Sequence, residues 1–251
     1  MPVHRPGRVR LARWFCRIVT GLLFDVRVEA PHGWPRQPVV YCFNHVGWTD
    51  PIFLIGVLPG RPKYAMFGPK EADMTVGGRN RLISWLGFGI PYHPAKDDML
   101  EIARRVARIL ADGWSIAIAG EGRIHRGERE LLPLADGVAY FALRSGVPVV
   151  PLAVNGTSWL GFRRRVRIRV GEAIPAEGRP SRENVAALKR QAEDALLALV
   201  ADFPDPGVPG PFGRWITELF NDWPEGVRPE LGAGDAAGTD LASRAGREAS
   251  A

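Results

Sequence analysis

Cysteines and long apolar runs are scarce in this 251-residue chain. The two cysteines, Cys16 and Cys42, are too few for a disulfide framework, and no CxxC pair occurs, so we expect a reducing compartment. No stretch reaches the length of about 18 apolar residues that a membrane-spanning helix needs. The basic N-terminus has no small-residue cleavage site, and Arg17 interrupts its apolar run, so we expect no secretory signal.

Several catalytic and binding signatures are also missing. The chain has no GxSxG sequence, which would indicate a serine nucleophile at a strand-to-helix turn, and no HExxH sequence, which would indicate a zinc protease. Its five histidines are scattered, so we predict no metal site. No RNA-recognition signature or Cys/His finger spacing occurs, so a nucleic-acid partner is not expected.

The chain is rich in apolar and basic residues. Hydrophobic residues make up 46% of it, which supports one sizeable folded core and argues against wholesale disorder. The formal net charge of +6 favours anionic partners, such as a phosphorylated substrate, nucleic acid or an acidic membrane surface. Charge alone does not choose among these partners.

Short apolar runs alternate with helical patterns along the chain, which is typical of an α/β fold. Predicted strands cover residues 39–43, 63–66, 87–92, 114–119 and 147–154. Predicted helices cover residues 96–112, 136–145 and 181–202, the last capped by Ser181. We therefore predict a mostly parallel central sheet flanked by helices.

Composition divides the chain into three segments. Residues 1–25 are predicted to hold an N-terminal amphipathic helix, and residues 26–225 an α/β domain that ends in a Pro/Gly linker and a short aromatic helix at 215–223. Residues 226–251 are rich in Gly, Ala, Ser and charged residues, which predicts a disordered tail.

The predicted helix at 8–24 carries arginines at helical spacing, at positions 10, 13 and 17, beside Trp14, Phe15 and several aliphatic residues. A basic helix with aromatic residues next to its apolar face is suited to lying in an anionic bilayer interface. The alternative is a terminal helix that packs on the core. Sequence alone leaves both interpretations open, and we favour the membrane interface.

A second basic segment, residues 162–170, alternates strictly between arginine and apolar residues. Alternation places Arg163, Arg165, Arg167 and Arg169 on one face of a strand. The plain interpretation is an edge or solvent-facing strand. The alternative is a strip of arginines that faces phosphate groups.

The segment Asn44-His45-Val-Gly-Trp-Thr-Asp50 carries the clearest chemical signal. Histidine can accept a proton from a hydroxyl near neutral pH, and a carboxylate on its other ring nitrogen fixes its tautomer. Residues five apart do not share a helix face, so the pair can meet only across a strand-to-helix junction. The strand at 39–43 and the dipeptide Asp50-Pro51 predict such a junction, with Asp50 as N-cap and Pro51 in the first turn.

A glycine-rich turn follows the predicted strand at 114–119. Gly120 and Gly122 let a ligand approach the backbone, and open N–H groups there can hold an anion. Glu121 can accept a hydrogen bond from a hydroxyl or orient an arginine, and Arg123 and Arg126 can bind a phosphate.

Four blocks, in this order, resemble the glycerolipid acyltransferase superfamily, which includes lysophospholipid and 1-acylglycerol-3-phosphate acyltransferases. Residues 44–50 are similar to its NHxxxxD motif, and residues 87–93, 120–123 and 147–151 resemble its second, third and fourth blocks. Two positions depart from the family pattern. His93 stands where the second block often has an arginine taken to bind glycerol phosphate, and Gly120 stands where the third block usually has proline.

The resemblance implies an O-acyltransferase of phospholipid biosynthesis, attached peripherally to the cytoplasmic face of a membrane. His45 would act as general base oriented by Asp50. The donor would be an acyl thioester, acyl-CoA or acyl carrier protein, and no cofactor is expected. The acceptor would be a lysophospholipid or a related lipid, with a glycolipid as alternative. Predicted substrate-binding residues are Asn44, Glu121, Gly122, Arg123, Arg126, His93 and Lys96.

The competing hypothesis is a non-catalytic protein that binds anionic membranes or nucleic acid. Basic charge and the arginine strand motivate it. The intact His45/Asp50 pair beside Glu121 favours the enzyme, because binding alone needs no such pair.

Overall fold

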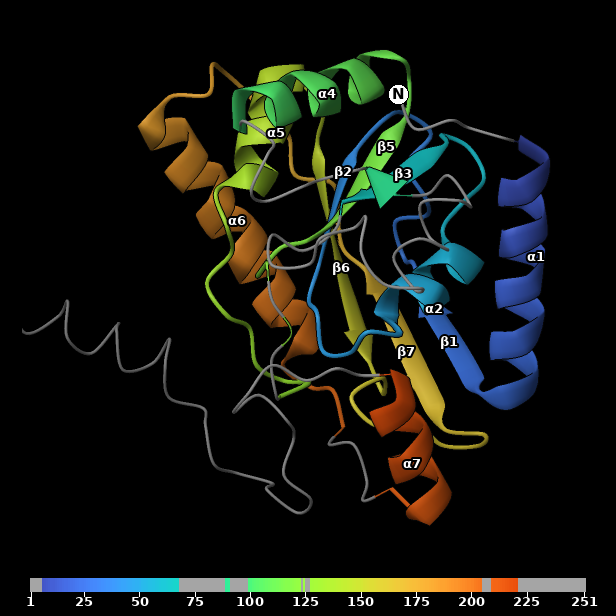
Figure 1. Ribbon diagram of the computed structural model, residues 1–251. Coiled ribbons are helices and arrows are strands. Elements are labelled where there is room, and N and C mark those ends of the chain that lie inside the picture. The colour runs from blue at the N-terminus through green and yellow to red at the C-terminus, as the bar shows by residue number, and fades with distance from the viewer. Residues whose placement is uncertain are drawn as a thin grey trace, which may run out of the picture.

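The computed structural model describes residues 6–67, 89–90, 99–122, 124, 127–204 and 209–220. Figure 1 gives the arrangement of the elements. The described helices are α1 (Pro6–Leu23), α2 (Asp50–Val57), α4 (Met99–Ala111), α5 (Gly137–Ser145), α6 (Arg182–Val200) and α7 (Pro211–Phe220). The described strands are β1 (Asp25–Glu29), β2 (Val40–Phe43), β3 (Tyr64–Phe67), β4 (Gly89–Ile90), β5 (Ser115–Ala119), β6 (Val149–Asn155) and β7 (Arg165–Val170).

The strands form one sheet in the order β1-β7-β6-β2-β5-β3-β4. Only the β6–β7 pairing is antiparallel, so the predicted mostly parallel sheet is confirmed. Helices α4, α5 and α6 cover one face, and α1 and α2 cover the other (Figure 1). The side chains of β2 alternate between the two faces of the sheet. Val40 and Cys42 pack in the core beneath α4, α5 and α6, and Tyr41 and Phe43 pack in the core beneath α1 and α2.

Strand β1 was missed by the sequence analysis, and it changes the interpretation of the arginine strand. Its sequence DVRVE has few apolar residues, but it pairs in parallel with β7 and places Asp25 beside Arg165 and Glu29 beside Arg169. The Nε atom of Arg165 lies 2.8 Å from an Asp25 carboxylate oxygen, and that of Arg169 lies 2.9 Å from Glu29. Strand β7 is therefore not an edge strand, since it lies between β1 and β6. Its arginines are exposed or partly exposed and alternate with buried apolar residues, which agrees with the solvent-facing interpretation.

The ends of two helices differ from prediction. Asp50 is the first residue of α2 and not its N-cap, which is Thr49 without a side-chain capping bond. Asp50 instead turns its carboxylate back toward the preceding turn. Helix α7 begins at Pro211, four residues before the predicted start, because proline suits the first helical turn. The N-cap of α6 is confirmed, since the Ser181 hydroxyl accepts the Asn184 N–H at 3.2 Å.

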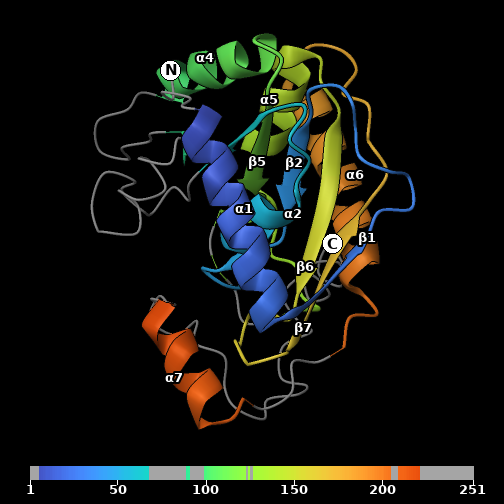
Figure 2. The same ribbon diagram turned by 90° about the vertical axis from the view of Figure 1, so that its right-hand side faces the viewer.

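Helix α1 has two different faces, as predicted for an amphipathic helix, but their composition is unexpected. Its inner face packs on α2 and the core through mostly small or partly polar residues: Val9, Ala12, Arg13, Cys16 and Thr20. Its outer face exposes a stripe of large apolar side chains, Leu11, Trp14, Phe15, Ile18 and Leu22, which are 37–66% exposed. Figure 2 shows α1 lying along the outside of the molecule. No described helix is long and apolar enough to cross a membrane.

Arg13 does not belong to the outer basic surface with Arg10 and Arg17. Its guanidinium donates hydrogen bonds to the backbone carbonyls of Leu58 and Pro59, the latter at 3.0 Å, and lies 5.6 Å from the centre of the Tyr64 ring. The carbonyls at the end of α2 attract the cation because a helix C-terminus carries partial negative charge and unpaired acceptors. Arg13 therefore joins α1 to the domain, which corrects its predicted role at a membrane surface.

We expect Arg13→Ala to destabilise the fold more than Arg10→Ala does, because Arg10 is exposed. Loss of the charged donor leaves two carbonyls unpaired and should lower the free energy of unfolding by about 1–2 kcal/mol. Chemical denaturation followed by circular dichroism measures the difference. Equal stability of the two variants would contradict this assignment.

Candidate active site

The carboxyl ends of three neighbouring strands define the candidate site. Strand β2 lies between β5 and β6, and all three are parallel, so the segments that follow them meet at one edge of the sheet. After β2 the chain enters α2 on one face, and after β5 it leads to α5 on the other. In open α/β sheets, ligands generally bind at such a switch point, outside the carboxyl ends of the strands.

The predicted His45–Asp50 pair forms at this edge. The Nδ1 atom of His45 lies 2.9 Å from Oδ2 of Asp50, and the two side chains are 5% and 0% exposed. A carboxylate at Nδ1 favours the tautomer with the proton on that nitrogen, which leaves Nε2 as the acceptor. Phe43 packs its ring edge-on near the imidazole, with centroids 5.9 Å apart. These two contacts fix the orientation of the imidazole.

Asp50 is held by further donors. Its Oδ2 atom accepts the N–H groups of Val46 and Gly47 at 2.9 and 3.0 Å, and its Oδ1 atom accepts the hydroxyl of Thr157. Every partner is a donor, which suits the acceptor-only ionised carboxylate. This use of the carboxylate explains why Asp50 does not cap α2.

Asn44 joins β2 to β6. Its amide nitrogen donates to the Val154 carbonyl at 3.0 Å, and its amide oxygen accepts the Val154 N–H at 2.7 Å. The side chain is fully buried. Both ends of the amide are therefore engaged by the neighbouring strand, and Asn44 fixes the turn that carries His45. The substrate contact that we predicted for it stays a prediction.

The glycine-rich turn follows β5 as predicted, and its backbone is engaged. The Gly120 N–H donates to the Phe43 carbonyl at 2.9 Å, and the Gly122 N–H donates to Ala119 at 3.1 Å. The expectation of open N–H groups is therefore wrong for these two glycines. Gly122 has a φ of 69°, in the left-handed region that glycine adopts without steric cost.

The structure gives a reason for glycine, and not proline, at position 120. Proline has no N–H for the bond to Phe43. A Cβ atom would also lie 2.6 Å from both the Cys42 sulfur and a methyl carbon of Leu134.

Neighbouring Glu121 is buried, and burial of Cys42 together with the Glu121 charge raises the pKa of the Cys42 thiol. Cys42 is thus a core residue, as predicted.

Four predicted substrate-binding residues, His93, Lys96, Arg123 and Arg126, lie outside the described residues. Among the described ranges, no cluster of three or more His, Cys, Asp or Glu side chains could hold a metal ion.

The sequence analysis did not identify Thr157 and Glu128. The fold brings both residues to the carboxyl edge of the sheet, where Thr157 contacts Asp50 and Glu128 contacts the segment after β6. Glu128 is 2% exposed and accepts hydrogen bonds from the segment after β6. Burial raises the pKa of Glu128, although the Ser158 hydroxyl and the Gly156 N–H oppose the shift. The only local sequence signal was a threonine shortly after a buried strand, which is too common a pattern to select.

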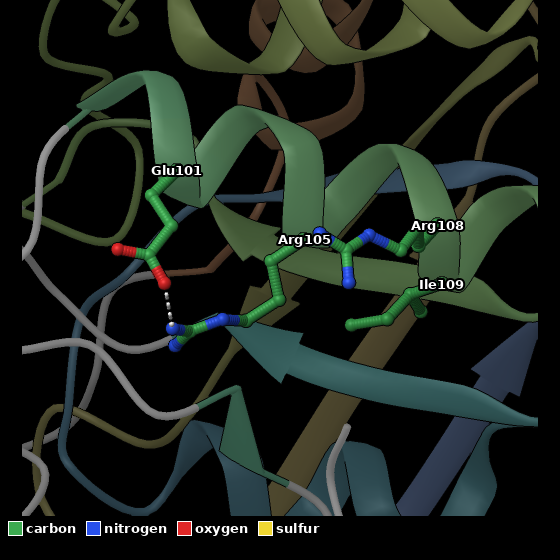
Figure 3. Close-up of a pocket in the computed structure, with 4 residues that line it drawn as sticks. All are labelled: Glu101, Arg105, Arg108 and Ile109. Carbon is green, nitrogen blue, oxygen red and sulfur yellow. Dashed lines mark hydrogen bonds and ion pairs between the residues drawn. The ribbon is translucent and has the colours of Figure 1, made fainter.

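A separate hollow lies along α4, where the described lining residues are Glu101, Arg105, Arg108 and Ile109 (Figure 3). Arg105 and Glu101 form an ion pair at 3.2 Å across one helical turn. Helix α4 packs on the sheet face opposite α2, and none of the predicted site residues that the structure describes is among the residues lining this hollow.

Comparisons with known proteins agree with this geometry. Residues 25–155 match the family model described as "Acyltransferase". A lyso-ornithine lipid O-acyltransferase of Pseudomonas aeruginosa is 30% identical over 227 residues, covering 77% of this chain and 80% of that protein. The 1-acyl-sn-glycerol-3-phosphate acyltransferase alpha of Homo sapiens is 26% identical over 199 residues, covering 74% of this chain and 68% of that protein.

A solved structure has the same fold. The 1-acyl-sn-glycerophosphate (LPA) acyltransferase PlsC from Thermotoga maritima superposes with a TM-score of 0.61 at 21% sequence identity, covering 79% of this chain and 83% of that chain. The fold is therefore an acyltransferase α/β fold with a buried His–Asp pair at its switch point.

The chain belongs to the acyltransferase family, which confirms the resemblance inferred from the four sequence blocks. It is an O-acyltransferase of lipid metabolism, and the hypothesis of a non-catalytic binding protein is set aside.

Proposed function

We propose that this enzyme moves a fatty acyl group from an acyl thioester, carried by CoA or acyl carrier protein, to a hydroxyl of a lysophospholipid or related lipid. His45 is the general base and Asp50 orients it. The observation that carries the proposal is the buried 2.9 Å contact between His45 Nδ1 and Asp50 at the carboxyl edge of the sheet. It leaves Nε2 as the proton acceptor.

The reaction follows from this arrangement. Nε2 of His45 takes the proton of the acceptor hydroxyl while the hydroxyl oxygen attacks the thioester carbonyl carbon. Asp50 stabilises the imidazolium that forms. The tetrahedral intermediate collapses with loss of the C–S bond, and the imidazolium returns the proton to the leaving thiolate. The products are an ester and a free thiol, so the step needs neither a serine nor a cysteine nucleophile.

We expect His45→Ala to lower kcat by about 10²–10⁴-fold with the fold retained, as for loss of a general base. Asp50→Asn should also lower kcat, because the amide favours the wrong tautomer. His32→Ala is the matched control, since His32 is exposed. Release of free thiol from acyl-CoA in the presence of a lysolipid measures turnover. A folded His45→Ala protein with turnover equal to the His32→Ala control would refute the mechanism.

The acceptor is proposed on two observations. The relatives include enzymes named for 1-acyl-sn-glycerol-3-phosphate and one named for lyso-ornithine lipid. In this chain His93 stands where the family pattern often has the arginine taken to bind glycerol phosphate. A lyso-ornithine lipid is therefore proposed as the preferred acceptor, because the absence of that arginine disfavours a glycerol-phosphate acceptor.

We expect kcat/KM for lyso-ornithine lipid to exceed that for lysophosphatidic acid by at least about tenfold, the effect of one charged hydrogen bond. The two acceptors are compared in mixed micelles, with acyl-CoA and acyl carrier protein donors, and the products are identified by mass. His93→Arg is the matched variant, and it should shift the ratio toward lysophosphatidic acid. A wild-type preference for lysophosphatidic acid would assign the phospholipid acceptor instead.

We further propose peripheral attachment to the cytoplasmic face of an anionic membrane through α1. The outer stripe of α1 is apolar, and Trp14, Phe15 and Leu22 are each at least 60% exposed. Exposed apolar stripes of this kind are unusual unless they contact another surface. Arg10 and Arg17 are exposed on the same helix and add an attraction that salt weakens.

We expect Leu22→Ser to reduce binding to anionic vesicles by about tenfold, because one large apolar side chain that becomes buried in the bilayer contributes about 1.5–3 kcal/mol. Leu100→Ser is the matched control, since Leu100 is an exposed leucine of α4, on the opposite side of the sheet. Co-sedimentation with neutral and anionic vesicles at low and high salt measures binding. Equal binding of the two variants would mean that the outer stripe of α1 does not contact the bilayer.

A further inference from the structure

The second oxygen of the Asp50 carboxylate has a partner from a distant part of the chain. Oδ2 serves His45 and the turn before α2, whereas Oδ1 accepts the hydroxyl of Thr157, which lies 107 positions further along the chain. Thr157 follows β6, and both side chains are fully buried. A carboxylate fixed at one oxygen alone could still pivot about its Cβ–Cγ bond. Bonds at both oxygens fix the plane of the carboxylate and therefore the direction of Oδ2.

The segment that carries Thr157 is itself anchored by a buried carboxylate. Glu128 accepts the Gly156 N–H at one oxygen, and the Ser158 N–H at 3.0 Å and the Ser158 hydroxyl at the other. The side-chain amide of Asn155 also donates to it. Glu128 thus holds the residues on both sides of Thr157, while the Thr157 hydroxyl remains directed at Asp50.

The turn before Thr157 depends on Gly156. Its φ is 90°, and a Cβ atom there would lie 2.2 Å from the Arg165 carbonyl oxygen of the adjacent strand β7. The backbone therefore passes close to β7 before it reaches Thr157. The close approach of β7 at Gly156 and the bonds of Glu128 to Gly156 and Ser158 together fix the backbone from which the Thr157 hydroxyl reaches Asp50.

We propose that Thr157 is a positioning residue for acyl transfer, which holds the Asp50 carboxylate in the plane that orients His45, and that Glu128 fixes the segment carrying it. The proposal rests on the proposed roles of His45 and Asp50. Thr157 is fully buried and its hydroxyl is bonded to Asp50, so it acts through Asp50. Loss of its hydroxyl lowers kcat, and KM for either substrate changes little because the substrate contacts are untouched.

The test compares Thr157→Val, which keeps the shape and removes the hydroxyl, with Thr157→Ser, which keeps the hydroxyl. We expect Thr157→Val to lower kcat by about tenfold to a hundredfold, the loss typical of one hydrogen bond to a buried charge, with KM within about twofold. Thr157→Ser should recover most of kcat. Thermal denaturation verifies that each variant is folded, and Thr157→Ala replaces the valine variant if that protein does not fold.

A double-mutant cycle with Asp50→Asn separates positioning from general stabilisation. If Thr157 acts through Asp50, Thr157→Val lowers kcat far less in the Asp50→Asn background than in the wild type. Additive losses would overturn the proposal, as would wild-type kcat in Thr157→Val or equal impairment of the serine and valine variants. When Asp50→Asn lowers kcat and Thr157→Val does not, only this proposal fails. Wild-type turnover of Asp50→Asn itself would remove the proposed mechanism and this proposal with it.

Discussion

The site depends on the hydrogen bonds that the buried carboxylate of Asp50 accepts. The carboxylate is fully inaccessible to solvent, and a buried charge is stable only when its oxygens are well supplied with donors. Those donors come from the turn before α2, from His45 and from the segment after β6. The requirement to satisfy one carboxylate therefore ties residues 45–47, which precede α2, to the segment after β6 at the carboxyl edge of the sheet.

The same edge is reinforced by hydrogen bonds that extend the strand pairing beyond the ends of the strands. Asn44 continues the ladder between β2 and β6 by bonding both backbone groups of Val154. Gly120 continues the ladder between β5 and β2 through its bond to Phe43. Rigid support of this kind keeps His45, the proposed general base, in one orientation, which is what proximity effects in catalysis require.

Helix α1 has an inner face that packs on the domain and an outer face that is exposed and apolar. Its inner face is narrow and uses Arg13 to reach the carbonyls at the end of α2, so the helix stays attached to the domain. Its outer face can then remain apolar without being needed for the core. The packing of the inner face agrees with the interpretation of a terminal helix on the core, and the apolar outer face is the surface on which the proposed membrane contact rests.

The sequence alone determined the α/β class, most elements and the His45–Asp50 pair, because alternating apolar runs and a short local motif record these features directly. It did not reveal β1, whose charged residues become favourable only beside the arginines of β7. Nor did it reveal that Arg13 faces inward, since helical periodicity gives spacing but not which face is buried. The hydrogen bonds of Thr157 and Glu128 depend on the tertiary structure alone. Their partners are distant in the chain and meet only when parallel strands align their carboxyl ends.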